Sequence, residues 1–537
     1  MKINIKKLDE KLSVTGQISI NDITEIAVSG FKSIICNRPD GEGGLDQPAS
    51  GQLENTANSL GVRFAYLPVE LGAVSVEHGA AFKKLIAELP GPILAFCRTG
   101  KRAAALYTLA KQTSPDGRQA ETQAVTAACN WSNAYDVVVI GGGSAGIGVT
   151  ASLLQRRPSL RIAIVEPSSK HYYQPAWTLV GGGAFDVTKT VRSMSEVIPR
   201  GAQWIQATAS GFDPDSNLVH LSDGRAIGYE QLIVCPGLRL AWERIEGLEE
   251  TLGKNGVTSN YRFDLASYTW SLVQNLKGGK ALFTQPPMPI KCAGAPQKAM
   301  YLSCDHWLRN QSLNTTEVEF NSAGGVLFGV ADFVPSLMEY VKRYSINLAF
   351  NSNLVKVDGA NKIAYFDVKD GDGVVTRVGK SFDMLHVAPP QLAPDFISHS
   401  PLADAAGWCE VDQKTLRHSR YPNIFSLGDV CSSPNAKTAA AVRKQIVVVA
   451  ENLLAAKEGR DMATSYDGYG SCPLTVEKGK VILAEFGFGG KLLPTFPLDP
   501  TVSRNTAWIL KARFLPWLYW NGMLKGREWL ARPSKQD

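Results

Sequence analysis

Short apolar runs that end in turn residues recur along the chain, and most have the length and composition of buried strands. In the first part of the sequence they cover residues 31–36, 62–67 and 92–97, with a helical pattern over residues 77–88. Strands that alternate with helices indicate a parallel sheet. Residues 1–112 are therefore predicted to form a small α/β domain.

The same pattern returns after a polar stretch rich in small residues, residues 113–133, which predicts an interdomain linker. Beyond it, strands are predicted over residues 135–140, 161–165, 229–237, 280–285, 324–330 and 347–357. Residues 134–507 are thus expected to form a second, larger α/β region, followed by a distinct C-terminal segment over residues 508–537.

A glycine motif follows the first strand of the larger region. Gly141, Gly143 and Gly146 have the G-x-G-x-x-G spacing, which allows a tight turn, close approach of a pyrophosphate and close packing of the next helix. The N-terminus of that helix points its dipole at the phosphates. Glu166 ends the next strand twenty residues after Gly146, where an acid meets a ribose hydroxyl. Together these residues predict a dinucleotide site.

Composition limits the function classes. The chain has 537 residues, of which 44% are hydrophobic and 20% charged, as in a folded enzyme of several domains. A net charge of +6 does not require nucleic acid, although it favours an anionic membrane surface. We expect neither a transmembrane helix nor a secretory signal, and no metal site. Nine cysteines without a regular framework indicate a reducing compartment with some reactive thiols.

Cys97 lies where the strand over residues 92–97 meets an Ala-rich helix. A helix N-terminus and nearby positive charge favour a thiolate. Four residues separate Cys97 from Arg102, one fewer than in a phosphatase loop, and CRTGKR resembles the sulfur-accepting loop of rhodanese-type sulfurtransferases. The wider domain, with its NRPDGE turn, resembles a phosphatase-like domain fused to persulfide-metabolising enzymes. Sulfurtransferase, phosphatase and a merely helix-capping thiol all stay open. The predicted sulfur-loop residues are Arg98, Thr99, Gly100, Lys101 and Arg102.

Several motifs of the larger region carry a second resemblance: CAGAPQKAMYLS, MLHVAPP, ADAAGW, YPNIFSLGD, KTAAAV, YDGYGSCPL and ILAEF. Together they resemble the mitochondrial-type sulfide:quinone oxidoreductases of eukaryotes and bacteria, from about Ala134 to the end. The resemblance implies a glutathione-reductase-like flavoprotein with tandem Rossmann units and FAD. It also implies oxidation of hydrogen sulfide, reduction of a membrane quinone, and transfer of sulfane sulfur to a thiol or sulfite acceptor.

Two further motifs resemble flavin-contacting segments of that superfamily. YEQLIVCPG resembles the second flavin-contacting strand, with Cys235 in place of a small residue, and YPNIFSLGD resembles the late motif whose acid, here Asp429, binds the ribityl chain. KTAAAV begins a helix whose N-terminus can face the flavin pyrimidine oxygens. The predicted cofactor-binding residues are Gly141, Gly143, Ser144, Ala145, Gly146, Glu166, Gly237, Asp429, Lys437 and Thr438.

A second glycine motif, which would hold NADH, is missing after the strand over residues 280–285. Prolines and Cys292 replace it, so a nicotinamide cofactor lacks its phosphate cradle. The alternative function is a type II NADH:quinone oxidoreductase-like flavoprotein with a phosphatase-like N-terminal domain, which would need that missing motif.

The resemblance implies two redox cysteines, and they carry over to Cys292 and, with a shift of one residue, to Cys431. Hydrosulfide would attack their disulfide or sulfur-bridged form and leave a persulfide on Cys431 and a thiolate on Cys292. Lys298 and Lys437 are candidates for stabilising the anions, and His386 is a candidate proton donor on the quinone side, although a structural role is the simpler interpretation of His386. Cys304, Cys409 and Cys472 are interpreted as structural.

The C-terminal residues 508–530 combine tryptophans and leucines with interspersed Lys and Arg, broken at Pro516. Such a pattern favours helices that lie on a membrane surface, which suits a lipid-soluble quinone, over helices that pack on the protein core. We therefore expect a peripheral (monotopic) protein on the cytoplasmic face of a bacterial inner membrane. The sequence leaves the oligomeric state open, with a homo-oligomer as one option.

Overall fold

The computed structural model describes residues 5–42, 47–69, 76–98, 100–112, 135–434 and 436–531. The chain divides into two compact units, Met1–Ala128 and Cys129–Asp537, and each is described by itself. The predicted linker, residues 113–133, lies outside the described residues.

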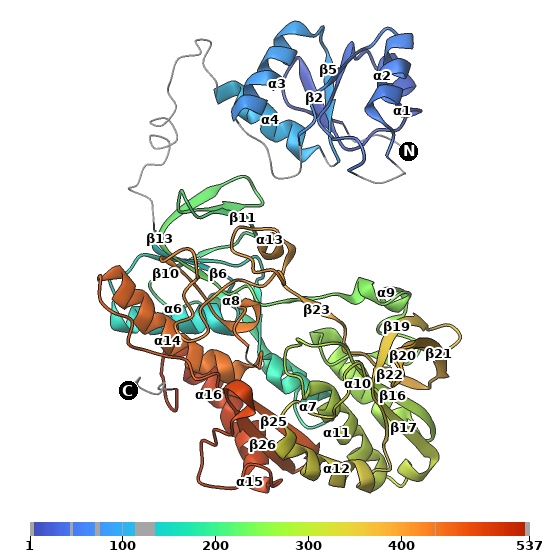
Figure 1. Cartoon of the computed structure of the whole chain (residues 1–537), viewed down its shortest axis with the longest axis vertical. Coiled ribbons are helices and arrows are strands. Elements are labelled where there is room, and N and C mark those ends of the chain that lie inside the picture. Colours follow the sequence, from blue (N-terminus) through green and yellow to red (C-terminus); the bar gives the residue numbers. More distant parts are fainter. Residues whose placement is uncertain are drawn as a thin grey trace. The chain divides into compact units, whose positions relative to one another are not determined.

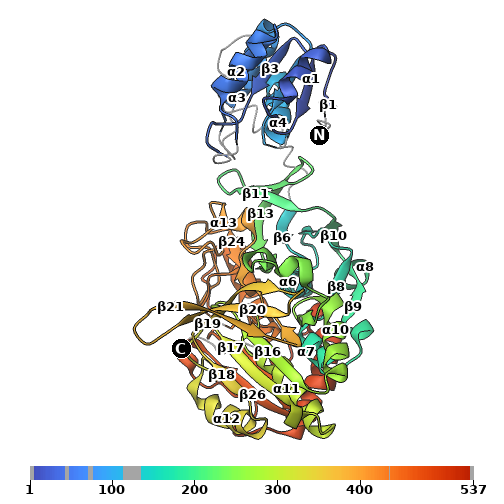
Figure 2. The same cartoon turned by 90° about the vertical axis from the view of Figure 1, so that its right-hand side faces the viewer.

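The first unit is a five-stranded sheet in the order β1-β2-β5-β3-β4, with helices on both faces (Figures 1 and 2). Only the edge pair β1 and β2 is antiparallel. One face packs on α3 and α4 and the other on α1 and α2. The strands are β1 Lys6–Lys7, β2 Leu12–Thr15, β3 Ser33–Cys36, β4 Arg63–Tyr66 and β5 Ile93–Phe96. The helices are α1 Asp22–Val28, α2 Ser50–Ser59, α3 Val76–Glu88 and α4 Lys101–Gln112. The α/β domain expected from the apolar runs is confirmed.

The second unit contains a dinucleotide-binding sheet in the order β10-β7-β6-β13-β12-β11, in which β24 also pairs with β13. β6 matches its predicted bounds because its four last residues are fully buried, as in a central parallel strand. Apolar residues of α6 and α14 cover one face of this sheet. The elements are β6 Tyr135–Ile140, α6 Ser144–Arg156, β7 Ile162–Val165, β10 Ala202–Ile205, β11 Ala209–Asp213, β12 Leu218–Leu221, β13 Ala226–Val234, β24 Ile424–Ser426 and α14 Ala439–Lys457.

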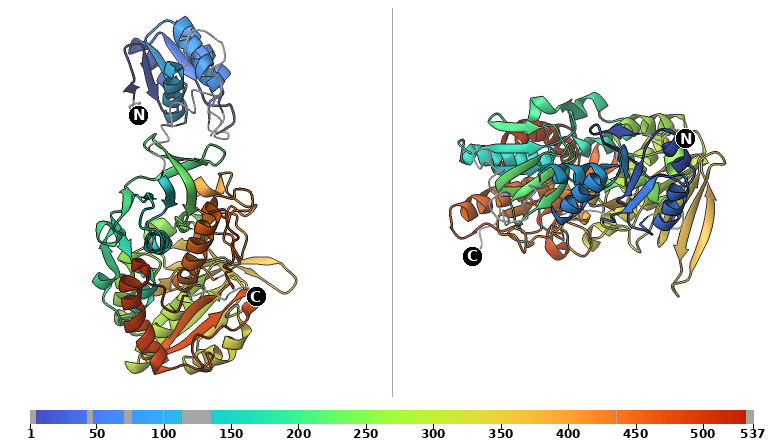
Figure 3. Two further views of the ribbon diagram at one scale, coloured as in Figure 1. Left: turned by 90° about the vertical axis from the view of Figure 1, so that its left-hand side faces the viewer. Right: turned by 90° about the horizontal axis from the view of Figure 1, so that it is seen from above.

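A second sheet, in the order β15-β22-β16-β17-β18, is parallel throughout. It is joined by the three-stranded sheet β19-β20-β21 and by the hairpin β25-β26, seen as orange-red strands in the left view of Figure 3. α11 packs between this sheet and the hairpin. The elements are β15 Val257–Thr258, α10 Phe263–Asn275, β16 Gly279–Gln285, α11 Ala295–Arg309, β17 Thr316–Ser322, α12 Val334–Arg343, β18 Asn347–Ala349, β19 Ser352–Asp358, β20 Ile363–Lys369, β21 Val375–Ser381, β22 Met384–His386, β25 Gly470–Glu477 and β26 Lys480–Phe486.

Short elements complete the second unit. They are β8 Lys170–Tyr172, α7 Trp177–Gly181, β9 Val191–Ser193, α8 Met194–Val197, β14 Arg239–Leu240, α9 Leu248–Thr251, β23 Gln391–Leu392 and α13 Asp395–Ser398.

Two strand predictions were wrong. Residues 324–330 form bends, because Gly324 and Gly325 interrupt the run and Leu327 and Phe328 fill the core from a loop. Residues 347–357 form two strands, β18 and β19, which belong to different sheets because Asn351 turns the chain between them at φ +52°.

The C-terminal segment is helical but short in each piece. α15 (Asn505–Ile509) leads into a π-helical turn over Leu510–Phe514, and α16 (Leu515–Asn521) follows with Pro516 in its first turn. α15 packs along β26 and the following turns reach α6. Among the helices that the structure describes, none has the length and apolarity needed to cross a bilayer.

Candidate active site

The glycine loop after β6 has the geometry that a dinucleotide requires. Gly141 has φ +105°, and a Cβ there would lie 2.6 Å from Cys235 O. A Cβ on Gly146 would lie 1.8 Å from Gly141 O, so only glycine lets α6 start this close to the strand. A Cβ on Gly143 would meet nothing within 4 Å, which leaves the space in front of the loop open.

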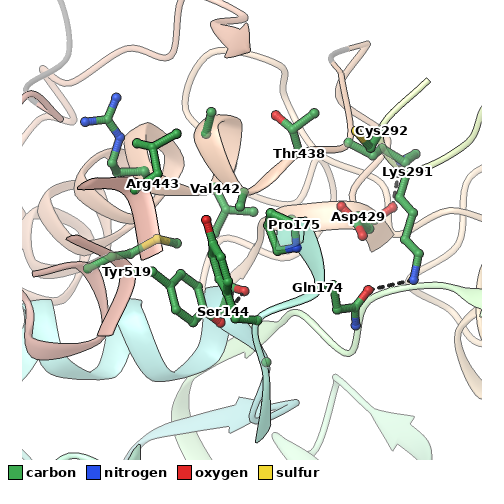
Figure 4. Close-up of a pocket in the computed structure, with 18 of the residues that line it drawn as sticks. Ser144, Gln174, Pro175, Lys291, Cys292, Asp429, Thr438, Val442, Arg443 and Tyr519 are labelled. Atoms are coloured by element: carbon green, nitrogen blue, oxygen red, sulfur yellow. Dashed lines mark hydrogen bonds between the residues drawn. The ribbon is translucent and has the colours of Figure 1, made fainter. Parts of the chain in front are cut away.

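That open space is the start of a cavity of about 470 Å³ (Figure 4). Most of the predicted cofactor residues line it; Gly141 and Gly146 do not, and lie behind it in the loop. Glu166 is one of the residues that line it, and its carboxylate accepts from Gly142 N and Ser168 N, each at 2.7 Å. Thr178 Oγ1 and both amide atoms of Asn260 are buried in this wall and have no hydrogen-bond partner among the described residues. Unpaired buried polar atoms around an open cradle fit a bound polar cofactor.

The C-terminal segment adds a residue that sequence reasoning missed. Tyr519, on α16, lies 2.8 Å from Ser144 Oγ and 2.6 Å from His171 Nε2. His171 Nδ1 donates to Gly142 O at 2.9 Å, and burial lowers the pKa of His171 to about 4, so the ring is neutral. Its Nε2 therefore accepts from the Tyr519 hydroxyl, and Ser144 donates to Tyr519. A residue more than 370 positions downstream thus braces the glycine loop.

The late motif after β24 lies at the other side of the cavity. Gly428 has φ +81°, and Asp429 follows it in the cavity wall. Burial raises the pKa of Asp429, opposed by the charges of Lys291 and Lys437. Lys437 Nζ donates to Asp429 O at 2.6 Å and Cys431 O at 3.1 Å and lies over the Trp408 ring. Thr438 caps α14 through Ala441 N at 3.2 Å, so the positive helix end faces the cavity.

Cys235 directly follows β13 and is a buried thiol. Its Sγ lies 3.8 Å from Gly141 O, and burial raises its pKa. Gly237, just beyond, has φ +78° and lines the cavity.

Cys292 lies in the same cavity wall, between β16 and α11. Its φ of +51° is rare for a side chain with a Cβ, and its N–H donates to Lys437 O at 2.9 Å. Its Sγ lies 3.8 Å from Cys472 Sγ on β25, and Lys298 Nζ donates to it at 3.1 Å. Gly294 makes this approach possible, since a Cβ there would lie 2.6 Å from Cys472 Sγ.

This pair of thiols is electrostatically unequal. A hydrogen bond from the Cys472 thiol lowers the pKa of Cys292 well below its ordinary value; burial opposes this, and the charges of Lys298 and Lys511 add to it. The pKa of Cys472 is raised by its hydrogen bond to Cys292 and by burial. The contact with Lys298 and the lowered pKa favour a thiolate on Cys292 over one on Cys472.

The predicted redox pairing of Cys292 with Cys431 stays a prediction, and the thiol that the structure places in contact with Cys292 is a different one, Cys472. Cys431 is buried in the core of the dinucleotide-binding sheet, and its Sγ donates to Gly428 O at 3.2 Å. Burial raises its pKa. The thiol opposite Cys292 belongs to Cys472, which had been interpreted as structural; Cys304 and Cys409 are buried elsewhere in the core.

Two other groups complete the inventory of this site. Lys511, in the π-helical turn, is buried and donates to Pro473 O and to Thr475. His386 is not among the residues that line the cavity: its Nε2 accepts from Asn260 N at 3.0 Å, its ring stacks on Phe283, and burial lowers its pKa to about 4. These contacts support the structural interpretation of His386.

In the first unit, Cys97 follows β5 and is buried at 2% exposure, and Gly100 turns the chain at φ +81° just before α4. Arg102 donates to Asn37 O at 3.0 Å and to the carboxylate of Glu42, which also accepts from Arg38 at 2.7 Å. Burial raises the pKa of Glu42, but its hydrogen bonds from Arg102 and Arg38 prevail and hold it low. Arg98 is exposed, whereas Thr99 and the Lys101 side chain lie outside the described residues.

Comparison with known proteins agrees with this architecture. Residues 135–273 match the family described as pyridine nucleotide-disulphide oxidoreductase, and residues 4–114 match the phosphatase-like domain of the beta-lactamase hydrolase-like protein. The sheet order, the glycine loop and the cavity define the second unit as a flavoprotein of the first of these classes, which implies FAD.

Within that class the chain belongs to the sulfide:quinone oxidoreductase family. It is 41% identical over 400 residues to the mitochondrial sulfide:quinone oxidoreductase of Mus musculus, covering 74% of this chain and 88% of that protein. The sulfide:quinone oxidoreductase structure from Aquifex aeolicus shares the fold at a TM-score of 0.61 and 18% identity, over 74% of this chain and 92% of that one.

The first unit has its own relative. It is 37% identical over 112 residues to the beta-lactamase hydrolase-like protein of Agrobacterium fabrum, which is 21% of this chain but only 25% of that protein.

Proposed function

We propose that the chain oxidises hydrogen sulfide to sulfane sulfur at Cys292 and Cys472 and passes the two electrons to a membrane quinone. The observation that carries the proposal is the pair of sulfurs, 3.8 Å apart, beside a cavity that begins at the dinucleotide loop. Lys298 holds a positive charge 3.1 Å from one of the two sulfurs.

The inequality of the thiols sets the direction of attack. In the oxidised enzyme a disulfide joins Cys292 and Cys472. Hydrosulfide forms a new S–S bond with Cys472 as the old one breaks, and Cys292 leaves as the thiolate that Lys298 stabilises. The persulfide then resides on Cys472, in place of the Cys431 of the sequence analysis. A thiol or sulfite acceptor removes the outer sulfur and leaves both electrons of the oxidation in the enzyme.

The glycine loop, Glu166 and Asp429 would hold FAD, which would supply a two-electron acceptor between sulfide and quinone. Lys437 and the N-terminus of α14 would provide positive potential at this site. Figure 4 places Cys292 and Lys291 on the same side of the cavity as Asp429 and Thr438. The thiolate and the late motif are thus brought to one end of the cavity.

The alternative donor, NADH, lacks a cradle. After β16 the chain contains Pro286, Pro287 and Pro289 before Cys292, where a glycine loop would have to expose its N–H groups to a pyrophosphate. The test is anaerobic titration of the purified holoenzyme. Sulfide should bleach the flavin absorbance within one turnover, and NADH at micromolar concentration should not. Rapid bleaching by NADH alone would overturn the proposal.

For the first unit we propose that Cys97 accepts sulfane sulfur as a persulfide. Cys97 follows a parallel strand directly before a helix N-terminus, which is where an anionic sulfur is stabilised. The Glu42 carboxylate already neutralises Arg102, so a phosphate dianion would have to displace it, whereas a singly charged persulfide needs less compensation. A phosphatase is the competing activity.

Sulfur transfer is tested on the full chain with thiosulfate as donor and cyanide as acceptor. Cys97→Ser should remove the activity, and Cys36→Ser, which alters the neighbouring buried thiol, should retain most of it. Hydrolysis of aryl phosphates without sulfur transfer would assign the phosphatase activity instead.

We also propose that the C-terminal segment docks on a membrane surface, in bacteria the cytoplasmic face of the inner membrane. Large apolar side chains are exposed in this segment and in the loop before it, and three of them, Phe496, Phe514 and Leu530, also line the cavity. The exposed set is Phe496, Leu498, Val502, Ile509, Phe514, Trp517, Trp529 and Leu530. Trp517 and Trp529 stack on one another and are 47% and 46% exposed. Aromatic side chains of this kind favour the headgroup region of a bilayer.

Docking is measured by cosedimentation with vesicles of phosphatidylcholine and phosphatidylglycerol. The double substitution Trp517→Ser and Trp529→Ser should release the protein while sulfide still bleaches the flavin. Substitution of Trp242, outside this patch, serves as the matched control. Unchanged cosedimentation of the double variant would refute this surface.

A further inference from the structure

Among the described residues, three carboxylates line the cavity, and the proposed function assigns a role to only two of them. Glu166 and Asp429 lie at the nucleotide and late-motif positions. The third, Glu485 on β26, is only 3% exposed. It has no cation partner among the described residues and is held by hydroxyl and amide donors instead. A buried carboxylate in an enzyme cavity needs a function or a partner.

The hairpin that carries Glu485 also carries Cys472, on its opposite face. Side chains alternate along a strand, and Ser471 pairs with Glu485 while Cys472 pairs with Ala484. Ser471, Pro473, Leu483 and Glu485 line the cavity. Cys472 and Ala484 face the core around α11. Cys472 and Glu485 therefore lie on opposite faces of the same hairpin, and only Glu485 lines the cavity.

Glu485 is joined to apolar residues of the cavity, since its carboxylate accepts from Thr495 N and the next residue, Phe496, also lines the cavity. Further apolar lining residues come from the C-terminal segment, namely Leu510, Phe514, Leu515, Leu518 and Leu530. Several of these side chains are exposed and form the proposed membrane surface. A lipid-soluble quinone would enter the cavity here, so Glu485 is the acid at the quinone end.

Glu485 is connected to a second cavity of about 610 Å³ through hydroxyl groups. Its carboxylate accepts from the Tyr469 hydroxyl, the Thr495 hydroxyl and Thr495 N, the last at 2.9 Å. The hydroxyls of Tyr469 and Thr495 are 3.3 Å apart. Tyr469 and Thr495 line both cavities, together with Leu530. Thr495 is exposed, so the second cavity reaches solvent.

Charged groups surround the outer part of this connection. Lys444 Nζ lies 4.3 Å from the centre of the Tyr469 ring and 3.5 Å from Asp467, and both residues line the second cavity. Burial raises the pKa of Tyr469, with the Glu485 charge adding to it and Arg443 opposing. Tyr469 therefore stays protonated and can both donate and accept a proton within one hydrogen-bonded chain.

We propose that Glu485 protonates the quinone and is itself reprotonated from the second cavity through Tyr469 and Thr495. This inference rests on the proposed function. Oxidation of hydrogen sulfide to sulfane sulfur releases two electrons and two protons, and reduction of a quinone to a quinol consumes two of each. One quinol O–H bond forms as the O–H bond of the Glu485 carboxylic acid breaks. The Glu485 carboxylate then regains a proton through the hydroxyls of Tyr469 and Thr495. Each hydroxyl gives its proton toward Glu485 and takes up another from the side of the second cavity. The second quinol proton follows by the same path.

The test separates the two half-reactions of the holoenzyme carrying Glu485→Gln. Anaerobic sulfide should bleach the flavin at the wild-type rate, whereas reoxidation by a soluble ubiquinone analogue should slow by about 10²-fold, as for loss of a general acid. Reoxidation by ferricyanide, which takes electrons without protons, should keep its rate. A merely structural role of Glu485 would slow both acceptors together.

The matched control is Glu477→Gln, on the same hairpin. Glu477 is also buried, but it pairs with Arg343 and Lys480 and lies outside both cavity walls. The Glu477→Gln substitution should leave the rates of both half-reactions unchanged. Tyr469→Phe is a second test variant that keeps the carboxylate. It should slow flavin reoxidation by the quinone analogue several-fold and raise the solvent deuterium isotope effect on that step. Reoxidation by ferricyanide should keep its rate.

The outcomes are distinct. If the quinone analogue reoxidises the flavin of Glu485→Gln at the wild-type rate, the inference is overturned while the proposed function stays intact. A wild-type enzyme that sulfide fails to bleach overturns the proposed function itself. Should Glu485→Gln fail to fold, Tyr469→Phe decides: equal losses with quinone and ferricyanide refute the relay, and a loss confined to quinone supports it.

Discussion

The two units each place a cysteine between a parallel strand and the following helix, near positive charge, but the charge makes different contacts in each. In the second unit Lys298 donates directly to the Cys292 sulfur, and the pKa of this thiol is lowered. In the first unit the Arg102 guanidinium is held by the Glu42 carboxylate and by Asn37 O, so its charge is compensated before any ligand arrives. A basic residue near a cysteine is therefore not enough to predict a thiolate. The cation must contact the sulfur itself, as Lys298 does, and not a carboxylate, as Arg102 does.

The largest effect should come from removing the partner thiol. Cys472→Ser should abolish sulfide-dependent quinone reduction, by at least about 10³-fold, because no disulfide can form for hydrosulfide to attack. FAD should stay bound, since Cys472 lies outside the cofactor cradle. The measurement is steady-state quinone reduction together with the flavin spectrum.

Cys431→Ser is the matched control for that prediction. Cys431 is as buried as Cys472 and lies two residues from Asp429, yet its contact is with a backbone carbonyl. Its substitution should cost less than about threefold in rate, as for a conservative buried change without a chemical role. Loss of activity in Cys431→Ser with retention in Cys472→Ser would reverse the assignment.

The next effect should come from the cation. Lys298→Met removes the charge 3.1 Å from Cys292 Sγ and should raise the pKa of that thiol. Because a lowered pKa keeps the thiolate present down to lower pH, its loss should move the acidic limb of the pH–rate profile to higher pH. The measurement is the rate of flavin bleaching by sulfide as a function of pH. If the acidic limb does not move, Lys298 does not lower the pKa of the Cys292 thiol.

How far the sequence predicts these sites depends on how local each one is. β6, the glycine loop and Glu166 lie within about thirty residues and follow from strand and turn chemistry, so they were predicted with the right bounds. Cys97 and Arg102 were likewise predicted from one loop. What that loop does not contain is Glu42, sixty residues earlier, whose carboxylate changes the electrostatics of the site.

The contact between Cys292 and Cys472 could not be predicted in the same way. Cys472 lies 180 residues further on, and only the packing of α11 against β25 brings the two sulfurs together. The motif YDGYGSCPL contains Cys472, whereas the sequence analysis assigned the second redox position to Cys431 because of its place after Gly428 and Asp429. Tyr519 and Glu485 were missed for the same reason, because nothing near them in sequence indicates the cavity that they share with Ser144.

A third prediction tests whether the cofactor cradle of the second unit depends on the remote C-terminal segment. Tyr519→Phe removes the hydroxyl that joins Ser144 to His171 and leaves a buried His171 nitrogen without its donor. Losing such a bond costs about 1–3 kcal/mol, which corresponds to an about 5- to 150-fold rise in the dissociation constant for FAD. The measurement is FAD release on dilution, followed by fluorescence. Cys97 chemistry should be unaffected, and Tyr466→Phe, which alters a hydroxyl bonded to Tyr469 O outside the cradle, is the control.

The smallest effect is expected in the first unit, and it tests the comparison directly. Glu42→Gln removes the carboxylate from Arg102 and Arg38 and leaves two uncompensated guanidinium groups near the loop of Cys97. If the carboxylate is what distinguishes this site from that of Cys292, the freed charge should favour the Cys97 thiolate. Alkylation of Cys97 by iodoacetamide in the full chain, followed by mass spectrometry at pH 7, should then become a few-fold faster. Glu25→Gln, on α1 and exposed, should leave the rate as it was, and an equal rate in both variants would show that Arg102 acts on the backbone around Asn37 and not on the thiol.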